Sequence, residues 1–305
     1  MNWYIRKADK DSVKEYTVED WEFTPARRED SLGMTEGFSP DLNFRKAFLP
    51  EPGHYWISRD FAGQEIRILA NLAMEETWIK TIQSGGDIHT ATAIQVWGAE
   101  NYNSKSRKNA KAINFGIIYG STAYGIADQL GITEDEAQAY IDKYYEKLPA
   151  IKRYLETCAR DALRTKETQN IYGRKRRLKR YITPWGKMQN RGIRISYNFP
   201  IQSMGAEITK LALIKIYNTM ILGKEFPEKD FYFKNTIHDE ANGSCAYAII
   251  KEVAFRLGEV MTHKMPGKPI PITTDLEIGH SMGLIWKFDQ DKNTHELTPV
   301  FVEKY

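Results

Sequence analysis

Four side chains with two different chemistries recur at every fourth position of the sequence. Arg107 and Lys111 are cations, and Phe115 and Tyr119 are aromatic. An α-helix turns about 100° per residue, so residues four apart drift by only about 40° and form one stripe roughly 18 Å long. A nucleoside triphosphate has the same polarity, with charged phosphates at one end and a flat base at the other. The stripe therefore predicts a nucleotide-binding helix; an amphipathic helix with solvated cations and core aromatics is the alternative.

Acidic residues stand at the ends of two predicted strands. Asp60 ends the segment YWISRD, and Asp239 lies with Glu240 at the tip of a predicted hairpin. If the sheet brings Asp60 and Asp239 together, they would hold two Mg²⁺ ions roughly 4 Å apart, completed by substrate phosphate oxygens. Mn²⁺ would serve as a substitute. The alternative is that Asp60 caps a helix and that residues 238–240 form an ordinary polar turn.

The segments around these residues predict an α+β fold. The first 40 or so residues are polar and irregular, whereas residues 65–164 read as almost wholly helical, with N-terminal signals at Asp87, at the Thr133–Glu136 capping box and at Pro149. Gly120 suits a left-handed helix end. Further elements are strands at 54–61 and 271–279, a basic loop at 172–181, helices at 200–221 and 247–264, and a hairpin at 231–247. This order describes a sheet domain carrying a helical insertion.

Composition narrows the class of protein. The 305 residues carry 43 Lys and Arg against 40 Asp and Glu, and the net charge of +3 is too small to indicate a polyanionic partner by itself. The two cysteines, Cys158 and Cys245, are too few for a disulfide framework. The charged N-terminus does not resemble a signal peptide, and no apolar run approaches the roughly 18 residues that span a bilayer. We therefore expect a soluble intracellular protein without a membrane partner.

Five segments in order carry a family resemblance. DFAGQEIR, at residues 60–67, resembles motif A of family A DNA polymerases, the group of bacterial DNA polymerase I and its phage relatives. RKNAKAINFGIIYG matches motif B, RxxxKxxxFGxxYG, at every fixed position, and HDE at 238–240 resembles motif C. DIHTATA at 87–93 and RISYNFPIQSMGAEITK at 194–210 match further family segments. The resemblance covers roughly residues 43–286, and the sequence of residues 43–65 looks more similar to phage members of the family than to bacterial ones.

The resemblance implies an architecture. We expect an antiparallel palm sheet with a helical fingers insertion, which is a right-hand polymerase fold that lacks most or all of the thumb. The implied parts are an N-terminal thumb or palm remnant at 1–42, palm at 43–73, fingers at 74–190 and palm again at 191–305. Family members carry a thumb, and often a 3′–5′ exonuclease, before motif A, but fewer than 60 residues precede Asp60 here. We therefore expect no proofreading in this chain, and either a second polypeptide that supplies thumb and exonuclease or a reduced enzyme of low processivity.

The resemblance also implies catalytic roles. Asp60 and Asp239 would ligate two catalytic metals, with the backbone carbonyl of Phe61 assisting and Glu240 supporting the site. Lys111 would be a proton donor to pyrophosphate.

Binding of the incoming dNTP is implied for the stripe and two other residues. Arg107, Lys111 and His89 would hold the triphosphate, Phe115 would stack on the nucleotide, and Tyr119 would lie where the templating base enters. Glu65 would pack below the sugar and exclude a ribose 2′-hydroxyl.

Contacts to primer–template DNA are implied for two groups of residues. Those facing the minor groove would be Arg194, Asn198, Gln202 and His238. Helix N-terminal capping is the alternative for Asn198 and Gln202. The densest basic cluster would touch template phosphates, and a solvated loop is its alternative; its members are Arg174, Lys175, Arg176, Arg177, Lys179 and Arg180.

The function implied by these roles is template-directed DNA synthesis, a Mg²⁺-dependent transfer of a nucleotide from dNTP to a primer 3′-hydroxyl. Two alternatives are open. A single-subunit RNA polymerase shares the palm and its two aspartates, but Glu65 and the FGxxYG ending favour DNA synthesis. A non-catalytic primer–template binding subunit would be expected to have lost Asp60, Asp239 or Lys111, and all three are present.

Overall fold

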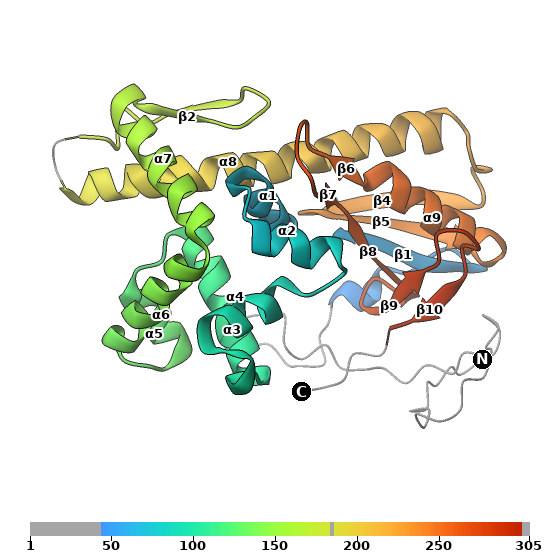
Figure 1. The fold of residues 1–305 in the computed structure, drawn as a ribbon. Helices are drawn as coiled ribbons and strands as arrows, with labels where there is room; N and C mark the ends of the chain where they lie inside the picture. Colours follow the sequence, from blue (N-terminus) through green and yellow to red (C-terminus); the bar gives the residue numbers. More distant parts are fainter. Residues whose placement is uncertain (1–43, 184–185, 301–305) are drawn as a thin grey trace.

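A six-stranded antiparallel sheet forms one half of the molecule (Figure 1). The structure, a computed structural model, describes residues 44–183 and 186–300. The strand order is β10-β9-β8-β1-β5-β4. In chain order the strands are β1 His54–Phe61, β4 Phe231–Ile237, β5 Glu240–Ala246, β8 Thr274–Ser281, β9 Leu284–Gln290 and β10 Leu297–Pro299. The predicted antiparallel sheet is confirmed, and β9 and β10 extend it beyond the last strand that the sequence indicated.

Helices between β1 and β4 form the other half of the molecule. They are α1 Gln64–Ala73, α2 Glu76–Gln83, α3 Ile88–Trp97, α4 Ser104–Tyr119, α5 Ala123–Leu130, α6 Glu134–Lys147, α7 Pro149–Thr165 and α8 Gly186–Lys215, the last continued by a π-helix, η4 Ile216–Leu222. α9 Ile250–Met261 follows β5, preceded by the short η5 Tyr247–Ile249, and is shorter than the predicted helix at 247–264. The remaining short elements are η2 Phe44–Ala47, η3 Ala99–Asn101, β2 Glu167–Gln169, β3 Lys175–Arg177, β6 His263–Lys264 and β7 Pro271–Ile272. No helix in the described ranges is both long and apolar enough to traverse a membrane.

The predicted helix ends are confirmed where side chains cap the backbone. The carboxylate of Asp87 accepts from the backbone N–H of Thr90 at 2.7 Å and starts α3. Thr133 and Glu136 form the full capping box of α6. Gly120 ends α4 with φ 72°, a left-handed conformation that a side chain would strain. The helices that carry the predicted site are therefore delimited by local rules.

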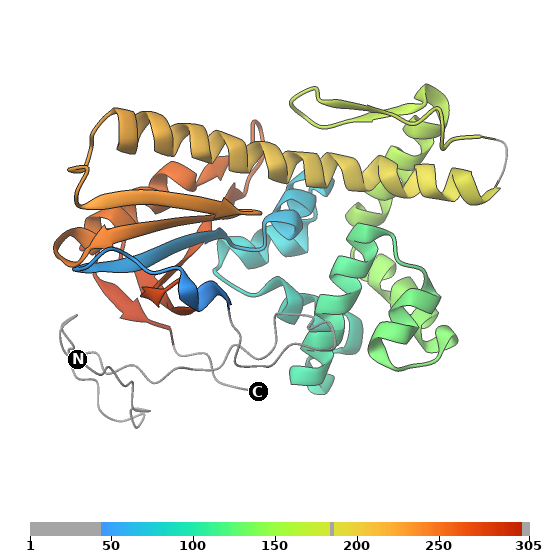
Figure 2. The same ribbon diagram turned by 180° about the vertical axis from the view of Figure 1, so that it is seen from behind.

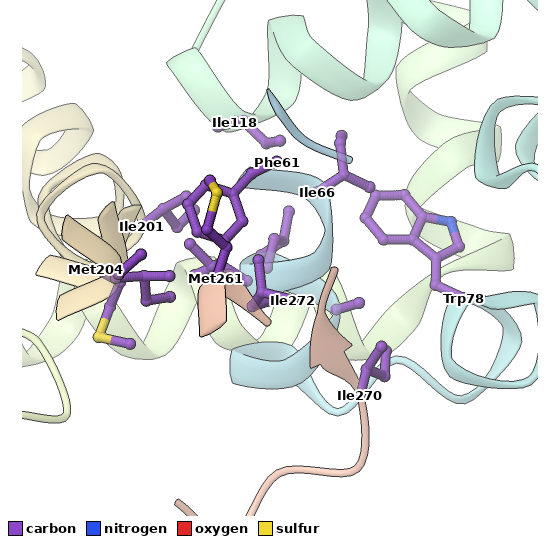
Figure 3. Close-up of a cluster of buried hydrophobic side chains, with 14 of the residues drawn as sticks. Phe61, Ile66, Trp78, Ile118, Ile201, Met204, Met261, Ile270 and Ile272 are labelled. Carbon is purple, nitrogen blue, oxygen red and sulfur yellow. The ribbon is translucent and has the colours of Figure 1, made fainter. Parts of the chain in front are cut away.

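One hydrophobic core joins the two halves of the molecule. Figure 3 shows Phe61 of β1, Ile66 of α1 and Trp78 of α2 in one cluster with residues of α8 and α9. Ile118 of α4 belongs to the same core and is fully buried. Because side chains in such cores are closely packed, the position of α4 relative to β1 is set by contacts that extend across both halves.

The helix α8 begins earlier than the sequence predicted. The expected start was Pro200, but the helix runs from Gly186 and contains Pro200 in its interior (Figure 1). A proline has no N–H, so the carbonyl of Ser196 loses its partner within the helix. The hydroxyl of Thr168 in β2 donates to that carbonyl at 2.7 Å. The predicted boundary between fingers and palm at residues 190 and 191 therefore lies inside a continuous helix.

The predicted basic loop is instead a hairpin, formed by β2 and β3, that lies along α8 (Figure 2). The Asn170 side chain accepts from the backbone N–H groups of Tyr172 and Arg174, both at 3.0 Å, and its own amide donates to Ser203 of α8 at 3.1 Å. The Tyr172 hydroxyl lies 2.5 Å from Nε2 of His263 in β6. The solvated-loop alternative is thus wrong for the backbone of this segment, because it pairs with β2 and its turn is attached to α8 and β6.

Candidate active site

Acidic side chains gather at one end of the sheet. The register places Asp60 of β1 opposite Glu240 of β5 on one side and opposite Asp275 of β8 on the other. Side chains directly opposite each other in antiparallel strands point to the same face. Asp239 precedes Glu240 in the two-residue turn between β4 and β5, in which His238 has φ 55°. Asp60 lies within β1 and Gly63 precedes α1, so the helix-cap alternative for Asp60 is wrong.

The acidic cluster perturbs one of its own members. Removal from water, followed by the charges of Asp239, Glu240, Glu277 and Asp275, raises the pKa of Asp60 to about 7. Nearby like charges have this effect because they disfavour the ionised carboxylate.

Two members of the cluster are compensated by cations and two are not. Glu240 accepts from the Ser58 hydroxyl at 2.7 Å and lies 3.5 Å from the Arg45 guanidinium. Asp275 is paired with Lys287 at 2.7 Å. Asp60 and Asp239 have no ion pair within residues 44–183 and 186–300. Their charges are therefore available to a cation from outside the chain.

The stripe predicted from sequence lies on α4, from its first turn to its last residue. Lys111 is exposed and Tyr119 is 45% exposed, while Phe115 is half-buried against the core. The rings of Phe115 and Tyr119 stack with centroids 6.3 Å apart. The alternative of core aromatics is therefore wrong for Tyr119 and holds only in part for Phe115. Arg107 is not free in solvent, because its guanidinium donates to both carboxylate oxygens of Asp87 at 2.9 and 3.1 Å.

His89 stands beside the stripe on the first turn of α3. Its ring centroid is 5.8 Å from that of Phe115. Burial, with help from the charges of Lys111 and Arg107 and against that of Asp87, lowers the pKa of His89 to about 4. The imidazole is therefore neutral near pH 7.

The aromatic end of the stripe reaches the acidic end of the sheet. The Tyr119 hydroxyl donates to Oε2 of Glu65 in α1 at 2.6 Å. Burial, this hydrogen bond and the charges of Glu65 and Asp239 raise the pKa of Tyr119. Asp239 is thus close enough to act on the Tyr119 ring, and the structure brings the stripe, Glu65 and the carboxylates into one site.

Residues of α8 approach the C-terminal end of α4. The Asn198 amide donates to the backbone carbonyl of Tyr119 at 3.3 Å. A Cβ at Gly120 would overlap the Tyr197 hydroxyl oxygen and stand 2.7 Å from Cδ of Arg194, so a side chain there would have to displace these α8 residues. Gln202 is exposed one turn further along α8, and His238 is exposed in the β4–β5 turn. Asn198 and Gln202 lie in the interior of α8, which makes their predicted capping alternative wrong.

The basic cluster is partly neutralised within the chain. Arg174 forms an ion pair with Glu207 of α8, and Lys175 pairs with Glu167 at 3.1 Å. The Arg176 guanidinium lies 6.0 Å from the Phe199 ring centre. The other members, Arg177, Lys179 and Arg180, are exposed.

Sequence reasoning missed three residues that shape the site. Asp275 and Glu277 stand two apart in TTDLEIG, so the predicted strand at 271–279 puts both on one face, but only the register places them beside Asp60. Asp87 was read as a helix cap, and its second role as the partner of Arg107 had no local signal.

Comparisons with known proteins identify the family. Residues 38–284 match the sequence profile of DNA polymerase family A. The chain belongs to this family. It is 38% identical over 183 residues to DNA polymerase I of Streptococcus pneumoniae, a stretch that covers 59% of this chain and 21% of that protein. DNA polymerase I of Lactococcus lactis subsp. lactis is 32% identical over 247 residues, or 79% of this chain and 27% of that protein.

A solved structure supports the family A fold. The polymerase domain of Pol1 from M. smegmatis, in complex with DNA primer-template and dNTP, superimposes with a TM-score of 0.72 and 25% identity, covering 79% of this chain and 42% of that chain. The predicted right-hand fold is thereby confirmed, and no thumb is present among the residues that the structure describes. The predicted remnant at 1–42 lies outside those residues. The chain spans 21% and 27% of the length of the two bacterial relatives above, and the phage resemblance stays a prediction.

Proposed function

We propose that this chain carries the active site for template-directed DNA synthesis, in which the 3′-hydroxyl of a primer attacks the incoming dNTP and pyrophosphate leaves. Family membership supports DNA synthesis as the reaction. The hydrogen bond between Tyr119 and Glu65 carries the proposal for this chain. It brings the aromatic end of the stripe on α4 close to the end of the sheet where Asp239, within the part of the chain that the structure describes, lies without an ion pair.

The donor set at the sheet end fits Mg²⁺. Asp60 and Asp239 offer hard carboxylate oxygens without competing cations, and Mg²⁺ accepts one or two carboxylates when substrate phosphates complete its shell. The residues described contain no cluster of three or more His, Cys, Asp or Glu side chains that could hold a metal by themselves. We assign Asp60, Asp239 and the backbone carbonyl of Phe61 as ligands of two Mg²⁺ ions, with Mn²⁺ as a substitute and Glu240 in support. Divalent ions so bound supply charge neutralisation and lower the pKa of the attacking hydroxyl.

The chain's own residues would hold the nucleotide from its phosphate end to its base end. Arg107, Lys111 and His89 would bind the triphosphate, and Lys111 would donate a proton to the leaving pyrophosphate. Phe115 would stack on the base, and Tyr119 would occupy the entry of the templating base until the fingers close.

Glu65 would select deoxyribose by excluding a ribose 2′-hydroxyl, and its carboxylate is positioned by the hydrogen bond that it accepts from Tyr119.

Primer–template DNA is the proposed macromolecular partner. Arg194, Asn198 and Gln202 of α8, with His238, would face its minor groove, where acceptors are common to all correct base pairs. The basic hairpin, with Arg174 and Arg176, would lie near template phosphates. We assign residues 43–73 and 191–305 to the palm and 74–190 to the fingers. A second polypeptide that supplies thumb and exonuclease is a further proposed partner, and a reduced enzyme of low processivity is the alternative to it.

Primer extension tests the proposal. The purified chain should extend a primed DNA template with dNTPs in a Mg²⁺-dependent reaction, and Asp239→Asn should abolish it. Incorporation of ribonucleotides in preference to dNTPs would favour the RNA polymerase alternative, and DNA binding without extension would favour the non-catalytic one. Robust long extension by the chain alone would rule out the need for a second polypeptide.

A further inference from the structure

An asparagine on α4 borders the stripe on its buried side, three residues after Lys111. Asn114 is fully buried. Its Nδ2 lies 3.0 Å from Nδ1 of His89 and 3.2 Å from Oγ1 of Thr92, both on α3. A side-chain amide carries two hydrogens on that nitrogen, so each contact can take one. Asn114 therefore connects α4 to the histidine that the proposed function places at the triphosphate.

The amide nitrogen of Asn114 can only donate, so Oγ1 of Thr92 and Nδ1 of His89 both accept from it. The Trp78 indole N–H of α2 also reaches Oγ1 of Thr92, at 3.2 Å. An indole N–H can only donate, so Thr92 Oγ1 is an acceptor in this contact. With one Asn114 hydrogen directed at the same oxygen, the other is directed at Nδ1 of His89, which must then carry a lone pair.

The state of His89 follows from its surroundings. The charged groups that act on its ring are Asp87, Lys111 and Arg107. Burial, Lys111 and Arg107 lower its pKa and together outweigh Asp87, which raises it, so the imidazole is neutral at pH 7. A neutral imidazole has one N–H and one lone pair. If Nδ1 accepts from Asn114, the proton is on Nε2, which makes no hydrogen bond within the described part of the chain.

We propose that Asn114 is a positioning residue that holds His89 in its Nε2–H tautomer and so presents an N–H donor to the phosphates of a nucleotide or to pyrophosphate. The opposite tautomer would turn a lone pair toward the anion and repel it. The inference has two halves. The phosphate half, that Nε2–H of His89 donates to phosphates, rests on the proposed function, whereas the tautomer half, that Asn114 fixes the proton on Nε2, does not.

A role in packing alone accounts poorly for an amide at this position. Oδ1 of Asn114 is buried without a hydrogen-bond partner among the described residues. Leaving a buried acceptor unsatisfied costs about 1–3 kcal/mol, and an apolar side chain would avoid that cost. What an apolar side chain cannot provide is the pair of N–H donors that Thr92 and His89 receive.

The tautomer can be measured without any enzymatic activity. In the ¹⁵N-labelled chain at pH 7, long-range ¹H–¹⁵N correlation spectra should show a protonated Nε2 and an unprotonated Nδ1 for His89. Pyrophosphate should then shift the Nε2 resonance more than the Nδ1 resonance. A protonated Nδ1 or a doubly protonated ring would overturn the tautomer assignment, whether or not the chain extends primers. A correct tautomer without a response to pyrophosphate would overturn the phosphate half.

Asn114→Asp tests the mechanism because a carboxylate keeps the shape of the amide but can only accept. It should move the His89 proton to Nδ1 and raise KM for dNTP by about 10-fold or more, with a smaller effect on kcat. Asn109→Asp, which adds the same charge on α4 outside the stripe, is the matched control.

A double-mutant cycle separates positioning from structural damage. In a His89→Gln background, Asn114→Asp should lose most of its effect on KM, because the group that it positions is gone. Asn114→Asp could instead raise KM equally with and without His89, and leave the His89 tautomer unchanged in the chain that still has His89. That result would show that Asn114 acts independently of His89 and would overturn the proposal.

Discussion

The two charged regions of the proposed active site differ in how their charges are balanced. On α3 and α4, Arg107 already has a carboxylate partner, Asp87, which binds it through two hydrogen bonds. At the sheet end, Asp60 and Asp239 have no cation among the described residues, and the pKa of Asp60 is raised to about 7 by burial and by its acidic neighbours. Within the described ranges, Arg107 is paired before a ligand arrives, whereas Asp60 and Asp239 are not.

This difference assigns the regions different energetic roles. An anion that binds Arg107 displaces the Asp87 carboxylate, so part of the Coulomb gain is offset by the ion pair that is lost. A cation that binds Asp60 and Asp239 relieves repulsion that the fold itself maintains. We therefore expect metal binding to change stability and activity most, and the cationic region to adjust nucleotide affinity.

The largest expected effect tests the acidic region. Asp239→Asn should lower Mg²⁺-dependent primer extension by about 10³-fold or more, since charge stabilisation by a catalytic metal is worth several kcal/mol. The variant should also melt at a higher temperature than the parent without metal, and should lose the rise in melting temperature that Mg²⁺ gives the parent. Asp128→Asn, at an exposed position of α5, is the control. If Mg²⁺ raised the melting temperature of the parent and of Asp239→Asn equally, the proposed difference between the acidic and cationic regions would be wrong.

The cationic region should respond less strongly. Arg107→Gln should raise KM for dNTP by about 10- to 100-fold, the cost of a charge-assisted hydrogen bond. Asp87→Asn should change KM by less than about 5-fold, because asparagine still caps α3 and only an exposed ion pair is lost. Steady-state kinetics with Lys108→Gln as control would check this. If Asp87→Asn weakened binding as much as Arg107→Gln, Asp87 would be orienting Arg107 rather than exchanging with the ligand.

Sugar selection probes the junction between the regions. Glu65→Ala should reduce discrimination against ribonucleotides by about 10-fold or more in single-nucleotide extension, because the carboxylate that excludes the 2′-hydroxyl is gone. Tyr119→Phe removes only the 2.6 Å hydrogen bond and should have a smaller effect. Unchanged selectivity in Glu65→Ala would refute the assignment of Glu65.

The smallest effect concerns stability and pH. The pKa of His89 is lowered from 6.5 to about 4, so below about pH 6.5 the unfolded chain binds a proton that the folded chain does not. Stability is therefore full above pH 6.5 and falls as the pH drops towards 4. Between pH 7.5 and 4.5 the free energy of unfolding should fall by about 1–3 kcal/mol less in His89→Gln than in the parent, as measured by urea unfolding at both pH values. His295→Gln, at a position after β9, is the control, and an unchanged pH profile in His89→Gln would contradict the neutral state of His89.

Local patterns were sufficient for the stripe and the end of α4 and for the start of α3, the two helices of the proposed nucleotide site. The four-residue spacing, the left-handed Gly120 and the cap at Asp87 each depend on neighbours within one or two turns, and all three are present in the structure. The sheet was predictable only in part. The pairing of Asp60 with Asp275 joins residues far apart in sequence, and no local rule sets that register.

Two errors came from rules that tertiary contacts override. Proline favours the first turn of a helix, so Pro200 suggested a start, but a hydroxyl from β2 satisfies the carbonyl that the proline frees. The run of cations from Arg174 suggested a loop because charged residues are poor strand formers. Pairing with β2 and attachment through Asn170 outweigh that preference.

Pro200 has a consequence for how the basic hairpin is mounted. A missing N–H at one position of a long helix leaves a carbonyl exposed to the side, and that carbonyl is the attachment point for Thr168. An ordinary amino acid there would close the helix's own ladder and compete with the hairpin for the same oxygen. Pro200 thus contributes, together with the contacts of Asn170 and Tyr172, to the orientation of the hairpin and of the cations that it carries.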